Sequence, residues 1–294
     1  MDTLWHVGIV RAGVAAFADA TFVPEVRWLP DAPFDAYLAD PILHTTGDGH
    51  VLVCERYDYA TRRGSIVLAP FDDGAVGSFR TIHAPGHHVS FPSLFASEGV
   101  TYATFEESAR RRVVLHRWAG MDLPFEPVAT LLEGVRAVDP FVFFHGGIHW
   151  LFVTDDEDVL RIFHADRVLG PYLPHRKNPF PRSPFGERSA GRPFARDGRT
   201  FRPVQVGHPR YGAATEIREI FHLSPDAFDE RPVRRIDPVP GRFGLGLHTV
   251  NGHGTWSVVD GLRRSRMPPV IRAVAGSVGA RLAARSTSRR SSPW

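Results

Sequence analysis

The feature that most constrains the fold is a motif that returns about every 50 residues. Each copy has a proline followed by apolar residues, a glycine-containing turn and then a second apolar run. The prolines are Pro41, Pro92, Pro140 and Pro193, which lie 51, 48 and 53 residues apart, and a weaker fifth copy occupies Leu247–Asp260. Self-similarity at a period of about 40–50 residues is typical of propeller blades, each a four-stranded sheet. The sequence therefore predicts an all-β, five-bladed propeller.

The ends of the chain predict how this propeller closes. Leu4–Val10 has the β-branched and aromatic composition of a strand but no hairpin partner nearby. In a closed propeller such a strand completes the last blade, so we expect it to pair with the run Trp256–Val259. A further short strand is expected near Val26–Leu29. The propeller is predicted to span residues 1–264.

The remaining segment, residues 265–294, differs in composition from the body. Beyond Asp260 there are eight arginines and no acidic residue, which leaves 27 basic and 32 acidic residues in the rest of the chain. Apolar residues between Pro268 and Arg285 recur near a helical spacing, but Gly276 and Gly279 weaken a helix. A partly helical or disordered basic tail is expected, with weak contact to a membrane surface as the alternative. A mildly acidic body argues against nucleic acid as a partner.

Cysteine content and the N-terminal sequence indicate the compartment. The single cysteine, Cys54, cannot form an intramolecular disulfide. The N-terminus lacks a basic region followed by an apolar one, and no apolar run reaches about 18 residues. We therefore expect a cytoplasmic protein.

The first strand of each blade lines the central channel, so the residue before each repeated proline is a candidate pocket residue. These residues are Asp40, Phe91, Asp139 and Arg192. Two carboxylates converging with an arginine are suited to general acid–base or charge-stabilising chemistry. The alternative is structural, because an aspartate at a strand start can simply accept backbone N–H bonds.

The second strands end in polar residues at a similar phase, namely Glu55, the pair Glu106 and Glu107, and Gln205. A carboxylate at the end of an apolar strand is costly to bury without a partner, so an arginine such as Arg192 or Arg202 is implied. Glu107 is the predicted acid with a raised pKa. A salt bridge to a core arginine is the alternative for the same residue.

Histidines offer only a weak metal signal. His87 and His88 precede the second copy, and His248 and His253 fall in the fifth, without the clustered spacing of a zinc site. We predict no metal and no cofactor.

A set of short motifs follows in order along residues 5–263: Trp28-Leu29-Pro30, Ala39-Asp40-Pro41, His88-Val89-Ser90-Phe91-Pro92, Val138-Asp139-Pro140, Ala190-Gly191-Arg192, Arg202-Pro203-Val204-Gln205, Tyr211-Gly212, His248-Thr249 and Val259-Asp260-Gly261. Their order resembles that of a known family, the N-terminal propeller domain of the glucosamine inositolphosphorylceramide transferases and its free-standing bacterial relatives.

That domain is similar in turn to the five-bladed propeller of family-43 glycoside hydrolases. The likeness implies a catalytic base at Asp40 and a pKa-tuning carboxylate at Asp139. The family's blade-4 acid has no match, because Ala190-Gly191-Arg192 stands there and Glu216 is not at the matching place. Glu107 is then the predicted proton donor.

These observations predict a carbohydrate-active propeller of a glycan or glycoconjugate pathway, either glycoside hydrolase-like or glycosyl-transferring. The alternative is a non-catalytic module that binds a glycan or a nucleotide sugar beside a glycosyltransferase partner. A pure protein-interaction scaffold is disfavoured by the ionisable channel mouth. The predicted catalytic residues are Asp40, Glu107 and Asp139, and the predicted substrate contacts are Glu55, His88, Arg192, Arg202, Gln205, Tyr211, His248 and Asp260.

Overall fold

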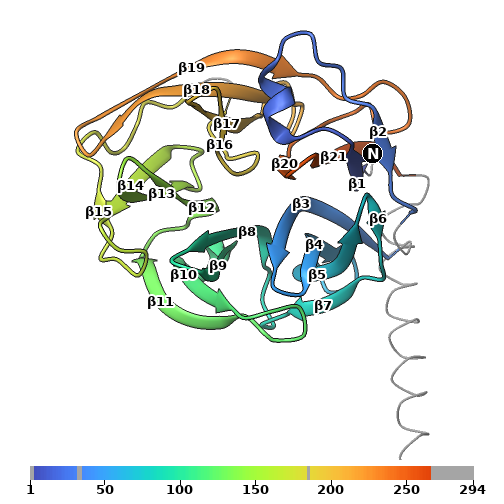
Figure 1. The fold of residues 1–294 in the computed structure, drawn as a ribbon, viewed down its shortest axis with the longest axis horizontal. Helices are drawn as coiled ribbons and strands as arrows, with labels where there is room; N and C mark the ends of the chain where they lie inside the picture. Colours follow the sequence, from blue (N-terminus) through green and yellow to red (C-terminus); the bar gives the residue numbers. More distant parts are fainter. Residues whose placement is uncertain (1–2, 32–34, 184–185, 266–294) are drawn as a thin grey trace, which may run out of the picture.

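The chain folds into a ring of five antiparallel sheets around a central axis (Figure 1). The computed structural model describes residues 3–31, 35–183 and 186–265. The predicted basic tail lies outside the described residues, except for Ser265. No helix in the described part of the chain is long and apolar enough to cross a membrane. The predicted all-β, five-bladed architecture is confirmed.

Four blades follow one another along the chain, each beginning with its innermost strand. In Figure 1 the innermost strands of the ring face its centre. Blade 1 contains β3 (Ala36–Thr46), β4 (Gly49–Asp58), β5 (Arg63–Asp72), β6 (Ala75–Val76) and β7 (Arg80–His83). Blade 2 contains β8 (Ser90–Ser97), β9 (Val100–Glu106), η2 (Ser108–Arg110), β10 (Arg112–Trp118) and β11 (Glu126–Glu133). Blade 3 contains β12 (Val138–His145), β13 (Ile148–Thr154), β14 (Leu160–Ala165) and β15 (Leu173–Pro174), and blade 4 contains β16 (Phe194–Arg196), β17 (Arg199–Val206), β18 (Ala214–Ser224) and β19 (Ala227–Ile236).

The fifth blade is shared between the two ends of the chain. Its order is β2 (Val26–Trp28), β1 (Thr3–Val10), β21 (Trp256–Arg264) and β20 (Val250–His253). Strand β1 pairs with β21 over its whole length, from Thr3 with Arg264 to Val10 with Ser257. The short 3₁₀ helix η1 (Val14–Ala18) lies between β1 and β2. Ring closure by an N-terminal strand is therefore confirmed.

The core consists of apolar layers between neighbouring blades. Residues of blades 1 and 2 form one cluster, those of blades 2 and 3 a second, and the remaining pairs of neighbours form three more. The layer between blades 5 and 1 contains Val7, Ile9 and Cys54, all of which are fully buried. Because every blade contributes to two layers, each sheet is held on both faces.

A β-bulge recurs at the start of the innermost strand in blades 1, 2 and 3. The pairing register of each strand shifts at Asp40-Pro41, at Phe91-Pro92 and at Asp139-Pro140. The residue before each proline has a left-handed backbone, with φ of 50° at Asp40, 44° at Phe91 and 47° at Asp139. Bulges often re-aim a side chain, and aspartate tolerates this conformation better than phenylalanine does.

Blade 4 departs from this pattern. Its innermost strand β16 begins only at Phe194, after the repeated proline, and Arg192 precedes the strand. The preceding residue, Gly191, has φ of 148°, and a Cβ there would lie 2.1 Å from the carbonyl oxygen of Val250. Only glycine fits this approach of blade 4 to blade 5.

Candidate functional site

Five carboxyl groups gather at the channel end where the innermost strands begin. Asp40, Glu55, Glu106, Asp139 and Asp260 are all buried, with between 0% and 8% of each residue exposed. The pairing register explains part of this gathering, because Glu55 pairs with Ala39 and Glu106 pairs with Ser90, each directly before a bulge. We call these five residues the carboxyl cluster.

Asp40 and Asp260 are linked through His248. Nδ1 of His248 lies 2.6 Å from Oδ2 of Asp260, and its Nε2 lies 3.8 Å from Oδ1 of Asp40. The carboxylate of Asp260 also accepts the backbone N–H groups of His248, Thr249 and Asp40. Asp260 therefore orients the imidazole, while Nε2 faces Asp40.

Asp40 has structural bonds of its own. One oxygen accepts the backbone N–H of Phe91 at 3.1 Å, and the other accepts the hydroxyl of Thr249 at 3.2 Å. About 10% of its side chain stays exposed. The structural role considered for this aspartate is thus real, and it coexists with a solvent-facing edge.

Asp139 is held by a side chain that the sequence analysis did not assign to the site. Arg188 donates from Nε to Oδ2 at 2.7 Å and from Nη2 to Oδ1 at 3.2 Å, a bidentate pair. Gln205 donates a further bond to Oδ2. Glu106 accepts the backbone N–H of Asp139 at 3.2 Å, and its Oε2 lies 3.6 Å from Nη2 of Arg188.

Glu55 is the least satisfied member of the carboxyl cluster. Its Oε1 is buried and has no hydrogen-bond partner among the described residues. His88 lies beside it: its Nε2 is 3.9 Å from Oε1, and its Nδ1 accepts the backbone N–H of Gly64. A carboxyl group in this position is expected to hold a proton.

The members of the carboxyl cluster differ in pKa because their surroundings differ. Burial raises the pKa of Asp40 to about 6, an effect that His248 opposes and that Asp260 and Asp139 enhance. Burial and the nearby Asp139 raise the pKa of Glu106 to about 8, although Arg188 acts in the opposite direction. Burial and Asp40 raise the pKa of Glu55 well above its usual range. Burial disfavours the imidazolium of His248, but Asp260 and Asp40 raise its pKa above the ordinary value.

Aromatic side chains form the rim beside this cluster. Trp5 stacks on His248 with ring centroids 3.6 Å apart, and Tyr211 meets both rings edge to face. The guanidinium of Arg188 lies 5.0 Å from the centre of the Tyr211 ring. Tyr211 is 48% exposed, so part of this aromatic side chain is open to solvent next to the carboxylates.

One subset of the cluster has the geometry of metal ligands. Ligand atoms of Asp40, His248 and Asp260 lie within 4.8 Å of one another. However, both oxygens of Asp260 already accept hydrogen bonds from the protein, including one from the ring of His248. The donor set therefore matches a hydrogen-bonded relay better than a metal site.

The structure places eight of the predicted site residues together. Asp40, Glu55, Asp139, Gln205, Tyr211, His248 and Asp260 lie at the channel mouth, and His88 lies beside Glu55. The predicted roles of these residues in catalysis or substrate contact stay predictions.

Three predicted residues lie elsewhere. Glu107 pairs with His87 at 2.7 Å and lies 3.8 Å from Arg112, which is not a core arginine because its side chain is 40% exposed. Arg202 is fully buried in a network with Glu187 and Glu230 inside blade 4.

Arg192, the third, donates to the backbone carbonyl of Leu94 and contacts none of the cluster carboxylates. Blade 4 lacks the bulge that holds Asp40 and Asp139 in blades 1 and 3, so the side chain of Arg192 does not take the place that these aspartates have.

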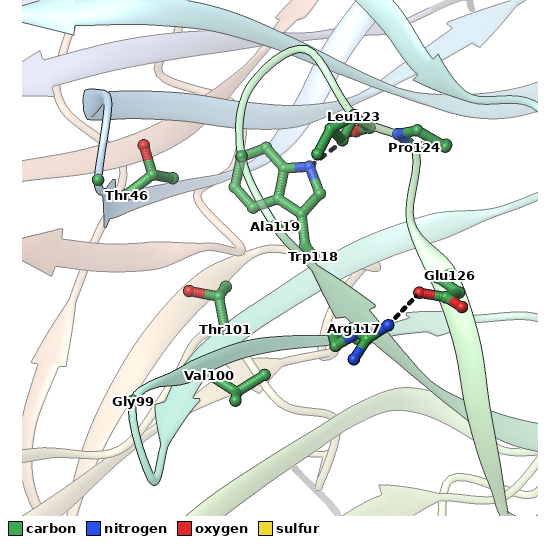
Figure 2. Close-up of a pocket in the computed structure, with 12 residues that line it drawn as sticks. Thr46, Gly99, Val100, Thr101, Arg117, Trp118, Ala119, Leu123, Pro124 and Glu126 are labelled. Carbon is green, nitrogen blue, oxygen red and sulfur yellow. Dashed lines mark hydrogen bonds and ion pairs between the residues drawn. The ribbon is translucent and has the colours of Figure 1, made fainter.

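A cavity of about 530 Å³ lies away from the cluster, between the turns of blades 1 and 2 (Figure 2). Its polar groups satisfy one another: the Trp118 indole donates to the carbonyl of Leu123, and Arg117 pairs with Glu126 at 2.7 Å. This cavity presents no unpaired charge, so the carboxyl cluster is the better candidate site.

The fold is that of a class: five-bladed propellers of the kind found in family-43 glycoside hydrolases. A β-1,3-galactosidase of that family superposes with a TM-score of 0.51 at 13% identity, covering 79% of this chain and 54% of the other. A β-xylosidase/α-arabinofuranosidase from a compost metagenome superposes with a TM-score of 0.53 at 13% identity, covering 81% and 93%.

Within this class the chain belongs to the family described as glucosamine inositolphosphorylceramide transferase 1, N-terminal, which matches residues 11–239. The resemblance seen in the sequence is thereby confirmed. Glucosamine inositolphosphorylceramide transferase 1 of Oryza sativa subsp. japonica is 28% identical over 264 residues, covering 83% of this chain and 35% of the relative.

The protein of the same name from Arabidopsis thaliana is 30% identical over 205 residues, covering 66% and 27%. The chain thus spans about a third of the length of these relatives. Membership of this glycosyltransferase-related family gives it a carbohydrate-related role.

Proposed function

We propose that the chain acts on a glycosidic bond at the carboxyl cluster, with Asp40 as general base and Glu106 as general acid. The observation that carries this proposal is a pair of carboxyl groups at one channel mouth whose environments hold them in different protonation states. Near neutral pH, Asp40, with a pKa of about 6, is mostly ionised, and Glu106, with a pKa of about 8, is mostly protonated. Such a split is the usual arrangement for acid–base catalysis by two carboxyl groups.

Glu106 takes the role first predicted for Glu107. It is the last residue of β9, and about 11% of its side chain is exposed. Burial and the negative charge of Asp139 favour the protonated form of Glu106, against the backbone N–H of Asp139, which favours the ionised form. Arg188 in turn neutralises Asp139, so the proton is held by Glu106. Asp139 and Arg188 are therefore positioning residues for the acid.

His248 and Asp260 serve the base in the same way. The bond to Asp260 fixes the imidazole, which faces Asp40 and favours its ionised form. Asp40 can then accept a proton from an attacking water or hydroxyl group.

The ligand class follows from the rim and from the charge. A sugar ring presents C–H groups on one face and hydroxyl groups at its edge, which matches Tyr211 beside hydrogen-bond-accepting carboxylates. Five carboxyl groups, opposed by Arg188 and His248, favour a neutral or positively charged sugar over an anionic one. Glucosamine, the sugar in the relatives' name, carries an ammonium group that fits this electrostatic field.

The test uses leaving groups of different quality. Aryl and alkyl glycosides of glucosamine, N-acetylglucosamine, galactose, xylose and arabinofuranose would be assayed for release of the aglycone. Glu106→Gln should reduce turnover of alkyl glycosides by about 10²–10⁴-fold, and that of nitrophenyl glycosides far less, because a good leaving group needs no proton.

Asp40→Asn should reduce turnover of both kinds of glycoside. Glu107→Gln is the matched control and should retain activity. Equal losses for both leaving groups in Glu106→Gln, or an inactivating Glu107→Gln, would refute the assignment.

A second function is favoured by one observation. Asp139 is fully engaged by Arg188 and Gln205, and among the described residues the carboxyl cluster contains no carboxyl group from blade 4. A binding module for a glycan or nucleotide sugar, working with a glycosyltransferase partner, would need only such a rigid polar site. Titration calorimetry separates the two functions: Asp40→Asn that binds sugar normally, in a chain without turnover on any glycoside, supports the binding module.

A further inference from the structure

A second cavity lies at the opposite end of the innermost strands from the carboxyl cluster. It measures about 330 Å³, within the range of small-molecule sites. It is lined by the distal halves of β8 and β12, by the segment from Arg192 to Ala195 and by Thr200 of β17. Asp139 begins β12, whereas Phe143, Phe144 and His145 at its far end line this cavity. The two sites therefore lie at different ends of the central channel.

Arg192 is the charged group of this cavity, and it has no acidic partner. No carboxylate of the described residues lies within 4.0 Å of its guanidinium, in contrast to the paired Arg117, Arg188 and Arg202. One of its Nη atoms donates to the carbonyl of Leu94, and its backbone N–H bonds to Asn251. Burial lowers its pKa to about 10, which reflects the cost of a charge without a counter-ion.

The ionisable neighbours of Arg192 add no negative charge. Burial, with Arg192 and His253 next in effect, lowers the pKa of His44 to about 4. Burial, His50 and Arg192 also lower the pKa of His253. Burial is the largest cause of both shifts, and the positive charge of Arg192 adds to each, so a bound anion would oppose that contribution.

The walls of the cavity are mainly apolar. Phe95, Val142, Phe143 and Phe194 line it, and Phe144 exposes 62% of its surface. Two polar side chains, Thr200 and His145, lie together in its lining, with Oγ1 and Nδ1 3.4 Å apart. An isolated guanidinium beside aromatic walls is suited to a ligand with an anionic head and an apolar body.

We propose that this cavity is a binding site for a small organic anion, a carboxylate or a phosphate monoester, whose oxygens bind the guanidinium of Arg192 while its apolar body packs against Phe143 and Phe144. The site is separate from the carboxyl cluster and does not depend on the function proposed there.

The experiment is calorimetric titration of the full chain with benzoate, phenyl phosphate, benzyl alcohol and inorganic phosphate, each up to about 10 mM. Benzoate or phenyl phosphate should bind at least tenfold more tightly than benzyl alcohol and inorganic phosphate. The stronger of the two identifies the head group.

The variants test the two halves of the site. Arg192→Met should weaken binding of the aromatic anions at least tenfold, and Arg192→Lys, which keeps the charge without the planar fork, should weaken it less. Arg117→Met, an exposed arginine beside the other cavity, is the matched control and should bind normally.

Phe144→Ala changes an exposed side chain, and it is the second test variant if Arg192→Met fails to fold. It should weaken binding of phenyl phosphate and spare inorganic phosphate. The proposal is overturned if neither aromatic anion binds or if binding survives in Arg192→Met. It is also overturned if benzyl alcohol binds as well as benzoate, or if inorganic phosphate binds as well as phenyl phosphate.

Discussion

Two carboxyl side chains at the channel mouth, Asp40 and Glu106, have pKa values raised to different extents, and this difference has a direct kinetic consequence. Asp40 must be ionised to act as base, so activity should fall as the pH drops through about 6. Glu106 must be protonated to act as acid, so activity should fall as the pH rises through about 8. The expected profile of kcat/KM against pH is a bell between these values.

The measurement is a pH–rate series on the best substrate of the glycoside panel. Glu106→Gln should abolish the alkaline limb of the residual activity and leave the acid limb in place. An alkaline limb that persists in Glu106→Gln would assign that limb to another group.

The raised pKa of Glu106 also predicts an effect on the stability of the fold. Glu106 has a raised pKa in the folded chain, about 8 against an ordinary value of 4.5. The folded state therefore binds its proton more tightly than the unfolded state does. The resulting stabilisation is complete below about pH 4.5 and is lost as the pH rises to about 8.

Glu106→Gln removes the ionisation and should raise Tm at pH 8.5 relative to the unsubstituted chain, with a much smaller difference at pH 5. Thermal unfolding at the two pH values measures it. The solvent-exposed Glu126→Gln is the control and should show no such pH-dependent gain.

At the scale of elements, the ring depends on one strand. Ile9 of β1 is 1% exposed and packs in the layer between blades 5 and 1. Ile9→Ala should lower the free energy of unfolding by about 2–5 kcal/mol, because the layer cannot collapse around the cavity. Urea unfolding measures this change.

Val23→Ala changes a side chain that is 80% exposed and should shift stability by less than about 0.5 kcal/mol. Similar losses in both variants would show that closure by β1 contributes little.

The elements were largely predictable from the sequence, whereas the site was predictable only in part. The prolines and glycine turns set the number of blades, and the unpaired run Leu4–Val10 indicated the closing strand. Glu106 and Glu107 are adjacent, and the alternation of side chains along β9 decides which one faces the channel. An error of one residue in phase exchanges the two.

Two arginines were misplaced or missed for different physical reasons. Arg192 shares the repeat phase of Asp40, but blade 4 lacks the bulge and its strand begins later, at Phe194. Arg188 lies in the long connection between blades 3 and 4, which has no repeat to align it. Only tertiary structure brings it to Asp139.

At the scale of the whole molecule, the ring is complete at Arg264, the last residue paired with β1. A chain ending at Ser265 loses six of the 35 Lys and Arg residues and none of the 32 Asp and Glu, so its formal net charge changes from +3 to −3. We expect this chain to fold with an unchanged Tm and to bind anion exchangers that the full chain does not.

Circular dichroism and ion-exchange chromatography check both points. A chain that fails to fold would show that the ring needs residues beyond 265. If the shortened chain folds, its activity on glycosides decides whether the proposed propeller domain, residues 1–264, is sufficient for function.

The three proline bulges also bear on how such a protein can change over evolutionary time. Each bulge gives the residue before its proline a left-handed backbone and leaves it outside the regular pairing. Two of these positions hold aspartate, and the third holds Phe91, in a backbone conformation that suits phenylalanine poorly. A single codon change there would add an ionisable group to the channel mouth without rebuilding a strand. The residues that set the chemistry of the channel mouth can therefore change during evolution while the strands that form the ring stay the same.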